Sequence, residues 1–173
     1  AGFGLYYHFD YHGSPVSYEW VNSTPLPKVW EQLTMAYEYG IKDLWIVNVG
    51  DIRPQELPLS YYMALAYDYE GMGINHPNET DDFIRGWVEE QFGGVVEDDD
   101  VKEEIVSVLK AYTRMHGNRR PEVTYPDTYH VTHYGENSKM IHLCHRIKKM
   151  ADDIDGKLPE EAKASYYGLV YYP

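Results

Sequence analysis

The first fifty residues change between strand-like and helix-like patterns of apolar positions. Every second side chain is apolar over residues 2–9, which predicts a strand. Residues 26–39 have apolar side chains three and four positions apart, which predicts a helix closed by Gly40, and residues 44–49 predict a second strand. The face of the first strand that we expect to be buried carries Phe3, Leu5, Tyr7 and Phe9. Strand, helix and strand in this order predict a βαβ unit with parallel strands.

From residue 59 onward the pattern predicts helices alone, separated by short polar links. The expected helices cover residues 59–69, 80–92, 100–116, 137–154 and 159–169. Cys144 lies on the apolar stripe of one of them, so we expect its thiol to be packed rather than reactive. Amphipathic helices joined by short links are typical of an antiparallel bundle.

These patterns divide the chain into an α/β part, residues 1–58, and a helical bundle domain, residues 59–173. The fold class is therefore an α-rich α/β one. Two parallel strands are too few for a stable sheet, and the first strand begins almost at Ala1. We therefore expect the chain to be a fragment of a longer α/β protein. Its two strands, with unpaired edges, should pair with another chain, rearrange or be poorly ordered.

Composition and charge narrow the classes of partner. The chain has 28 acidic and 15 basic residues and a net charge of −13, so it repels phosphate backbones and we expect no nucleic-acid partner. No apolar run approaches the roughly 20 residues that span a bilayer, so we expect no membrane segment. The single cysteine excludes an internal disulfide. The 18 tyrosines suit both an aromatic core and a surface on which sugars stack.

Polar side chains gather where the two predicted strands end. His8, Asp10 and Tyr11 lie at the end of the first strand, and Asn48 terminates an otherwise apolar row on the second. Ligands of parallel α/β folds bind beyond the carboxyl ends of the strands. We therefore expect a ligand site there, although an Asp and a His could also simply cap the turn.

Asp10 and Asp51 follow the two strands and could form the acid–base pair of an inverting glycosidase, which holds its carboxyl groups about 6.5–9.5 Å apart. The alternative is that one of the two only holds a loop. His142 and His145 are three positions apart on a predicted helix, but without a third ligand at suitable spacing we interpret them as an exposed pair. We expect no metal and no other cofactor.

Several segments resemble glycoside hydrolase family 115, the xylan α-1,2-glucuronidases. The resemblance is carried by YYHFDYHG, SYEW, PLPKVWEQ and WIVNVGD in this order, and more loosely by GWVEEQFG, KAYTRMHGNRRPE, YPDTY and LPEEAKASYYGLVYYP. It implies a multidomain parent protein. Residues 1–58 would be the last βα units of its (β/α)₈ catalytic barrel, and residues 59–173 the helical bundle domain that follows.

The resemblance also implies an activity and a pocket. The family removes 4-O-methyl-glucuronic acid side groups from glucuronoxylan with inversion, and its motifs place His8, Tyr11 and Asn48 among the substrate-binding residues. The acid and base carboxylates of the family lie on earlier barrel strands, so we expect the 173-residue chain alone to be inactive. A homodimeric parent protein in the periplasm or outside the cell would fit this resemblance.

A second interpretation keeps the helices apart from any catalysis. The tyrosine count and the run of amphipathic helices would also suit a non-catalytic helical module that binds a protein or a polysaccharide.

Overall fold

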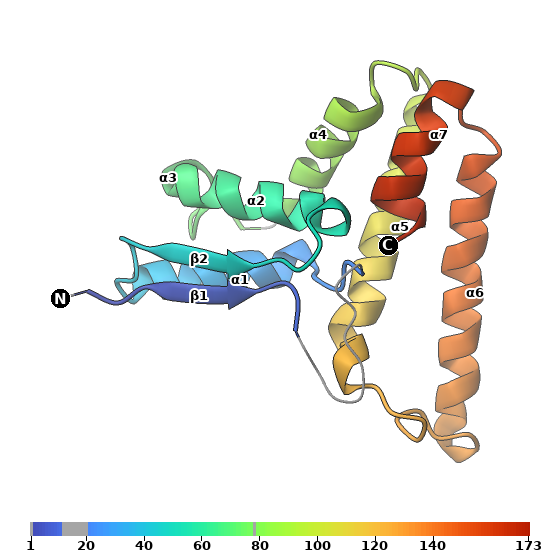
Figure 1. Ribbon diagram of the computed structural model, residues 1–173, viewed down its shortest axis with the longest axis horizontal. Coiled ribbons are helices and arrows are strands. Elements are labelled where there is room, and N and C mark those ends of the chain that lie inside the picture. The colour runs from blue at the N-terminus through green and yellow to red at the C-terminus, as the bar shows by residue number, and fades with distance from the viewer. Residues whose placement is uncertain (1, 12–20, 78) are drawn as a thin grey trace.

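The computed structural model describes residues 2–11, 21–77 and 79–173, and it is rich in helices with one small parallel sheet (Figure 1). Strands β1 (Leu5–His8) and β2 (Trp45–Asn48) pair in parallel, with Leu5 opposite Trp45 and His8 opposite Asn48. Helix α1 (Leu26–Glu38) connects them, so the predicted βαβ order is confirmed. Gly40 closes α1 at a φ of 92°, where its N–H donates to the carbonyl of Tyr37.

One face of the sheet is covered by α1 and by α2 (Glu56–Tyr67). The ring of Tyr62 on α2 lies 6.4 Å from that of Tyr7 and 5.9 Å from that of Trp45, and Tyr37 on α1 meets Trp45 edge to face. The other face is open, because Tyr6 keeps 62 % of its surface exposed. The sheet is therefore a one-sided layer whose strand ends are accessible from the open face.

The alternation predicted for the first strand holds only where helices cover it. Tyr7 and Phe9 are buried, as expected, but Phe3 is 83 % exposed. Its predicted burial is wrong because regular strand structure begins two residues later, at Leu5, so Phe3 lies outside the covered face.

The helical elements lie near their predicted positions, with two differences after β2. A 3₁₀ turn (Arg53–Gln55) leads directly into α2, which begins at Glu56 rather than at residue 59. Pro58 does not delay it, since a proline in the first turn of a helix has no N–H to satisfy there. A short helix, α3 (Tyr69–Met72), forms near the link between the helices predicted over residues 59–69 and 80–92. Its first turn is capped by the Asp68 carboxylate, which accepts from Gly71 N–H.

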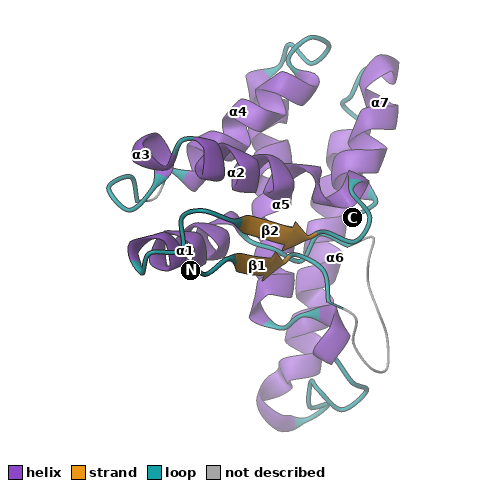
Figure 2. Cartoon of the chain, turned by 60° about the vertical axis from the view of Figure 1, so that its left-hand side comes forward, coloured by secondary structure: helices purple, strands orange, loops and turns teal. Residues whose placement is uncertain are grey.

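The later helices form the part of the molecule beside the sheet (Figure 2). They are α4 (Thr80–Phe92), α5 (Asp99–Asn118), α6 (Glu136–Asp155) and α7 (Glu160–Tyr166), followed by a π-helical turn (Tyr167–Tyr171). Two 3₁₀ turns, Pro121–Val123 and His133–Gly135, lie between α5 and α6. Helices α5 and α6 lie side by side and run in opposite directions (Figure 1). One cluster of buried apolar residues extends from Tyr7 to Val170, so helices and sheet share a core.

The apolar stripe of α6 is buried only in its second half. Ile147, Ala151 and Ile154 are buried, whereas Ile141 and Cys144 are exposed. The expectation of a packed thiol is therefore wrong. The spacing of apolar residues identifies a face of a helix, but it does not show whether a neighbouring element covers that face. Within the described ranges, none of the helices is both long and apolar enough to cross a membrane.

Candidate functional site

His8 and Asn48 meet at the last position of the parallel ladder. They are register partners, and Asn48 Nδ2 lies 3.4 Å from His8 Nδ1 and donates to the backbone carbonyl of Asp10 at 3.0 Å. The carboxamide nitrogen can only donate, so a hydrogen bond between these two atoms requires the Nε2-protonated tautomer of a neutral imidazole. The structure thus brings together an imidazole and a carboxamide from strands 40 residues apart.

Two tyrosine rings contact the imidazole. The ring of Tyr11 stacks on that of His8 with centroids 5.1 Å apart. The ring centroid of Tyr6 lies 4.4 Å from that of His8. Tyr11 remains 42 % exposed and Tyr6 62 % exposed. The strand ends therefore present a polar pair bordered by accessible aromatic rings, which is the mixture of surfaces that saccharides contact.

The two candidate carboxylates lie in opposite environments. Asp10 is only 1 % exposed and sits beneath the turn after β2, whereas Asp51 in that turn is exposed. Gly50 makes this arrangement possible, since it has a φ of 59° and a Cβ there would lie 3.0 Å from Asp10 Cγ. The structure places Asp10 and Asp51 near the same strand end, and their acid–base pairing stays a prediction.

Three residues that the sequence analysis did not single out hold the end of β1. The carbonyl of Phe9 accepts from Arg120 Nη1 at 3.1 Å and from Thr24 Oγ1 at 3.5 Å, and Arg120 also donates to Ser23 Oγ at 3.1 Å. Arg120 lies 111 residues after Phe9, so no local sequence pattern predicts this contact. The only sequence signal was its place in the segment KAYTRMHGNRRPE.

The histidines outside the strand ends give no metal centre in the described part of the chain. No group of three or more His, Cys, Asp or Glu side chains within those ranges could hold a metal ion. His142 and His145 are exposed on α6. His130 and His133 stack with centroids 3.8 Å apart, and His130 Nδ1 accepts from the N–H groups of Thr132 and His133.

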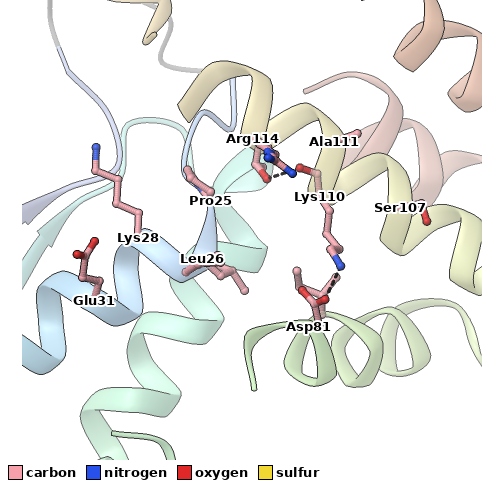
Figure 3. A pocket seen from close by; sticks show the side chains of 12 residues that line it. Pro25, Leu26, Lys28, Glu31, Asp81, Ser107, Lys110, Ala111 and Arg114 are labelled. Atoms are coloured by element: carbon pink, nitrogen blue, oxygen red, sulfur yellow. Dashed lines mark hydrogen bonds and ion pairs between the residues drawn. The ribbon is translucent and has the colours of Figure 1, made fainter. Parts of the chain in front are cut away.

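A hollow of about 790 Å³ lies away from the strand ends, between the start of α1, α4 and α5 (Figure 3). None of the five candidate residues lines it. Lys110 forms an ion pair with Asp81 across the hollow, and Lys28 extends in a different direction from Lys110 (Figure 3). Its basic groups do not converge on one point, so the strand ends remain the better candidate site.

Comparisons with known proteins concern the fold and the family of the chain. A solved structure described as a novel family GH115 4-O-methyl-α-glucuronidase, BtGH115A, with specificity for decorated arabinogalactans, matches with a TM-score of 0.78 and 24 % identity. The match covers 98 % of this chain and 23 % of that one, and at this identity it shows the fold alone. A comparison with curated proteins found no match.

The family comparison is more specific. The sequence model of glycosyl hydrolase family 115 matches residues 1–123, which include both strands, the strand-end residues and Arg120. The earlier resemblance to this family is thereby confirmed, and the chain belongs to glycosyl hydrolase family 115.

Proposed function

We propose that this chain forms part of the saccharide pocket of a glycoside hydrolase that removes (4-O-methyl-)glucuronic acid side groups from glucuronoxylan with inversion. The observation that carries the proposal is the contact between His8 and Asn48 at adjacent ends of parallel strands. An open face with aromatic rings beside this contact suits a sugar ring and its polar substituents.

Each of the three pocket residues has a group suited to a uronic acid. With His8 Nδ1 accepting from Asn48, the imidazole proton is on Nε2, from which it can donate to the uronate carboxylate. Asn48 uses its amide nitrogen within the protein, and its Oδ1 has no partner among the described residues, so it can accept from a sugar hydroxyl. Tyr11 offers a half-exposed ring and a hydroxyl.

The surroundings of Asp10 and Asp51 favour different roles for the two carboxylates. The burial of Asp10 against Gly50 favours a role in holding the strand end, whereas the exposure of Asp51 leaves it able to reach a ligand. Inversion needs two carboxyl groups about 6.5–9.5 Å apart, with water between one of them and the sugar. We infer that at least one of the pair comes from outside this chain, and that residues 1–173 alone do not turn over substrate.

The wider context of the proposal follows the family. Residues 1–58 would be the last βα units of a (β/α)₈ barrel, residues 59–173 the helical bundle domain after it, and the parent protein a homodimer. The chain covers 23 % of BtGH115A, which leaves room for a barrel in a protein of that kind. BtGH115A has specificity for decorated arabinogalactans, so arabinogalactan is the substrate against which glucuronoxylan must be compared.

The test uses the product of the complete open reading frame that contains this chain, together with the chain itself. Glucuronoxylan and arabinogalactan are incubated with each. NMR follows the release of uronic acid and identifies which anomer of the acid is released first. We expect release from glucuronoxylan with inverted configuration by the full product, and none by residues 1–173. His8→Ala and Asn48→Leu should reduce kcat/KM by about a hundredfold or more, whereas His142→Ala on exposed α6 should not.

The outcomes separate the parts of the proposal. Retention of configuration would overturn inversion, and release from arabinogalactan alone would overturn the xylan substrate. Turnover by the isolated chain would show that both catalytic carboxylates lie within it. If neither polysaccharide yields uronic acid, the glucuronidase function itself is wrong.

A helical module without catalysis is the second candidate, favoured by tyrosines that stand almost fully exposed. Tyr67 is 94 % exposed, Tyr134 86 % and Tyr39 84 %. Titration of the intact chain with xylan oligosaccharides, followed by tryptophan fluorescence, distinguishes the two. Binding lost in Tyr67→Ser but kept in His8→Ala would favour the module, and the reverse would favour the strand-end pocket.

A further inference from the structure

Arg120 reaches from the segment after α5 back to the end of β1. Its guanidinium group is partly buried, and Nη1 donates to the Phe9 carbonyl and to Ser23 Oγ, both at 3.1 Å. Phe9 is fully buried and comes between the two pocket residues His8 and Tyr11 in sequence. A hydrogen bond from a charged donor to this carbonyl therefore fixes the backbone from which the pocket side chains project.

The same guanidinium lies over the ring of Tyr11, 4.5 Å from its centroid. Tyr11 in turn stacks on His8 with an interplanar angle of 26°. The three groups form one continuous contact, from the cation to the phenol ring to the imidazole. The phenol ring of Tyr11 makes a cation–π contact with Arg120 and a ring contact with His8, so its orientation depends on both neighbours.

The chemistry of this contact requires an arginine. A guanidinium is planar, so it can lie along the ring of Tyr11 while its edge nitrogen donates to two acceptors at once. A lysine would keep the charge and a donor for Phe9, but its ammonium group has no flat face to lie along the ring. The adjacent Arg119 is a natural comparison, because its Nε donates to the carbonyl of Val123 and stabilises only the local turn.

We propose that Arg120 is a positioning residue of the saccharide pocket, which holds Tyr11 against His8 and so sets the orientation of both toward a uronic acid. This inference rests on the proposed function of the strand ends as a pocket. It gives the helical region a part in that pocket through a side chain 109 positions after Tyr11 (120 − 11).

The first test is spectroscopic and needs no substrate. In the 173-residue chain, NMR records the contact between the rings of His8 and Tyr11 and the ring-current shift of the His8 protons. We expect Arg120→Gln to abolish the contact and to move the His8 signals to their values in Tyr11→Leu. Arg120→Lys, which retains a donor for Phe9 and so protects the fold, should also lose the contact, and Arg119→Gln should keep it. A contact that persists in folded Arg120→Gln or Arg120→Lys overturns the proposal.

The second test is kinetic and uses the product of the complete open reading frame. We expect Arg120→Gln to lower kcat/KM for glucuronoxylan by about 10- to 100-fold, the range expected for a misplaced pocket group. Arg120→Lys, which keeps a donor for Phe9, should lower kcat/KM by no more than about threefold when it is added to Tyr11→Leu, because the ring that the guanidinium contacts is already absent. Fully additive losses would show a general structural role and overturn the proposal. If the unmodified protein releases no uronic acid, the proposed function fails, and the spectroscopic test alone decides the role of Arg120.

Discussion

Gly50 lies directly against the carboxyl group of Asp10. A Cβ on Gly50 would stand 3.0 Å from Asp10 Cγ and 3.1 Å from Asp10 Oδ2, and Gly50 has a φ of 59°. Asp10 follows β1 and Gly50 follows β2, so this contact ties the two strand ends together beside His8 and Asn48. A residue without a side chain is thus needed both for the backbone conformation and for the close approach.

Replacing Gly50 by alanine should strongly destabilise the sheet end. The substitution adds left-handed backbone strain and a methyl group that presses on a buried carboxylate, so we expect a loss of about 2–4 kcal/mol in the free energy of unfolding. Gly40→Ala is the matched control, because Gly40 also has a positive φ, of 92°, but a Cβ there meets nothing within 4 Å. It should cost about 1 kcal/mol, from strain alone. Equal losses in urea unfolding would show that the contact with Asp10 is unimportant.

The helix α3 should depend on the indole of Trp30. Trp30 Nε1 on α1 donates to the carbonyls of Met72 at 3.0 Å and Gly73 at 3.2 Å. Trp30→Phe removes the donor but keeps an aromatic ring, and we expect a loss of about 1–2 kcal/mol. The amide protons of Met72 and Gly73, which bond to Asp68 and Tyr69, should then exchange faster with solvent.

The control for this substitution is Trp45→Phe. Trp45 Nε1 donates to the carbonyl of Ile41 at 2.7 Å, four residues earlier, so its loss should leave the exchange of the α3 amides unchanged. Faster exchange at Met72 and Gly73 in both variants would point to a general loss of stability rather than to the Trp30 bond.

Much of the fold could be predicted from local patterns, because those patterns follow from the geometry of single elements. The alternation in residues 2–9 and the three- and four-residue spacing in residues 26–39 led to β1, α1 and their βαβ order. Burial was predicted less well, since it depends on neighbours. Phe3 and Cys144 both occupy correct apolar positions, and both are exposed because nothing in the described structure covers them.

In the site, too, sequence patterns predicted the contacts that follow from regular elements and missed those between distant segments. The proximity of His8 and Asn48 could be predicted, because parallel strands in register end at the same edge of a sheet, where ligands of such folds bind. The contact of Arg120 with Phe9 joins residues 111 positions apart, and no periodicity or motif spacing expresses such a pairing. The burial of Asp10 was also missed, because the alternation in β1 does not show that Gly50 packs against this side chain.

The thiol of Cys144 should react readily with a disulfide reagent. Cys144 is exposed on α6, and its Sγ lies 3.6 Å from Met115 Sδ, which does not shield it from solvent. We expect one thiol per chain to react under native conditions at a rate within about tenfold of that in urea, because exposure controls access to the thiolate. Met115→Leu should leave this rate unchanged. A reaction that occurs only after unfolding would contradict the exposure of this face of α6.

Stability should fall in mildly acidic solution because of His116. Burial lowers the pKa of His116 from 6.5 to about 4, and the edge of its ring meets Tyr112 with centroids 4.8 Å apart. The folded protein therefore keeps the imidazole neutral, while the unfolded chain binds a proton below about pH 6.5. The stabilising contribution is complete above that pH and is lost progressively as the pH falls toward about 4.

The size of this effect can be isolated with one variant. Between about pH 7 and pH 5, at 1.36 kcal/mol per pKa unit, proton binding to His116 in the unfolded chain should cost about 2 kcal/mol of stability. His116→Phe keeps a ring against Tyr112 and cannot titrate, so its free energy of unfolding should fall by about 2 kcal/mol less over this range than that of the unmodified chain. His142→Gln, on the exposed part of α6, should follow the unmodified chain. Parallel curves for His116→Phe and the unmodified chain, measured by urea unfolding, would show that His116 is not held neutral by the fold.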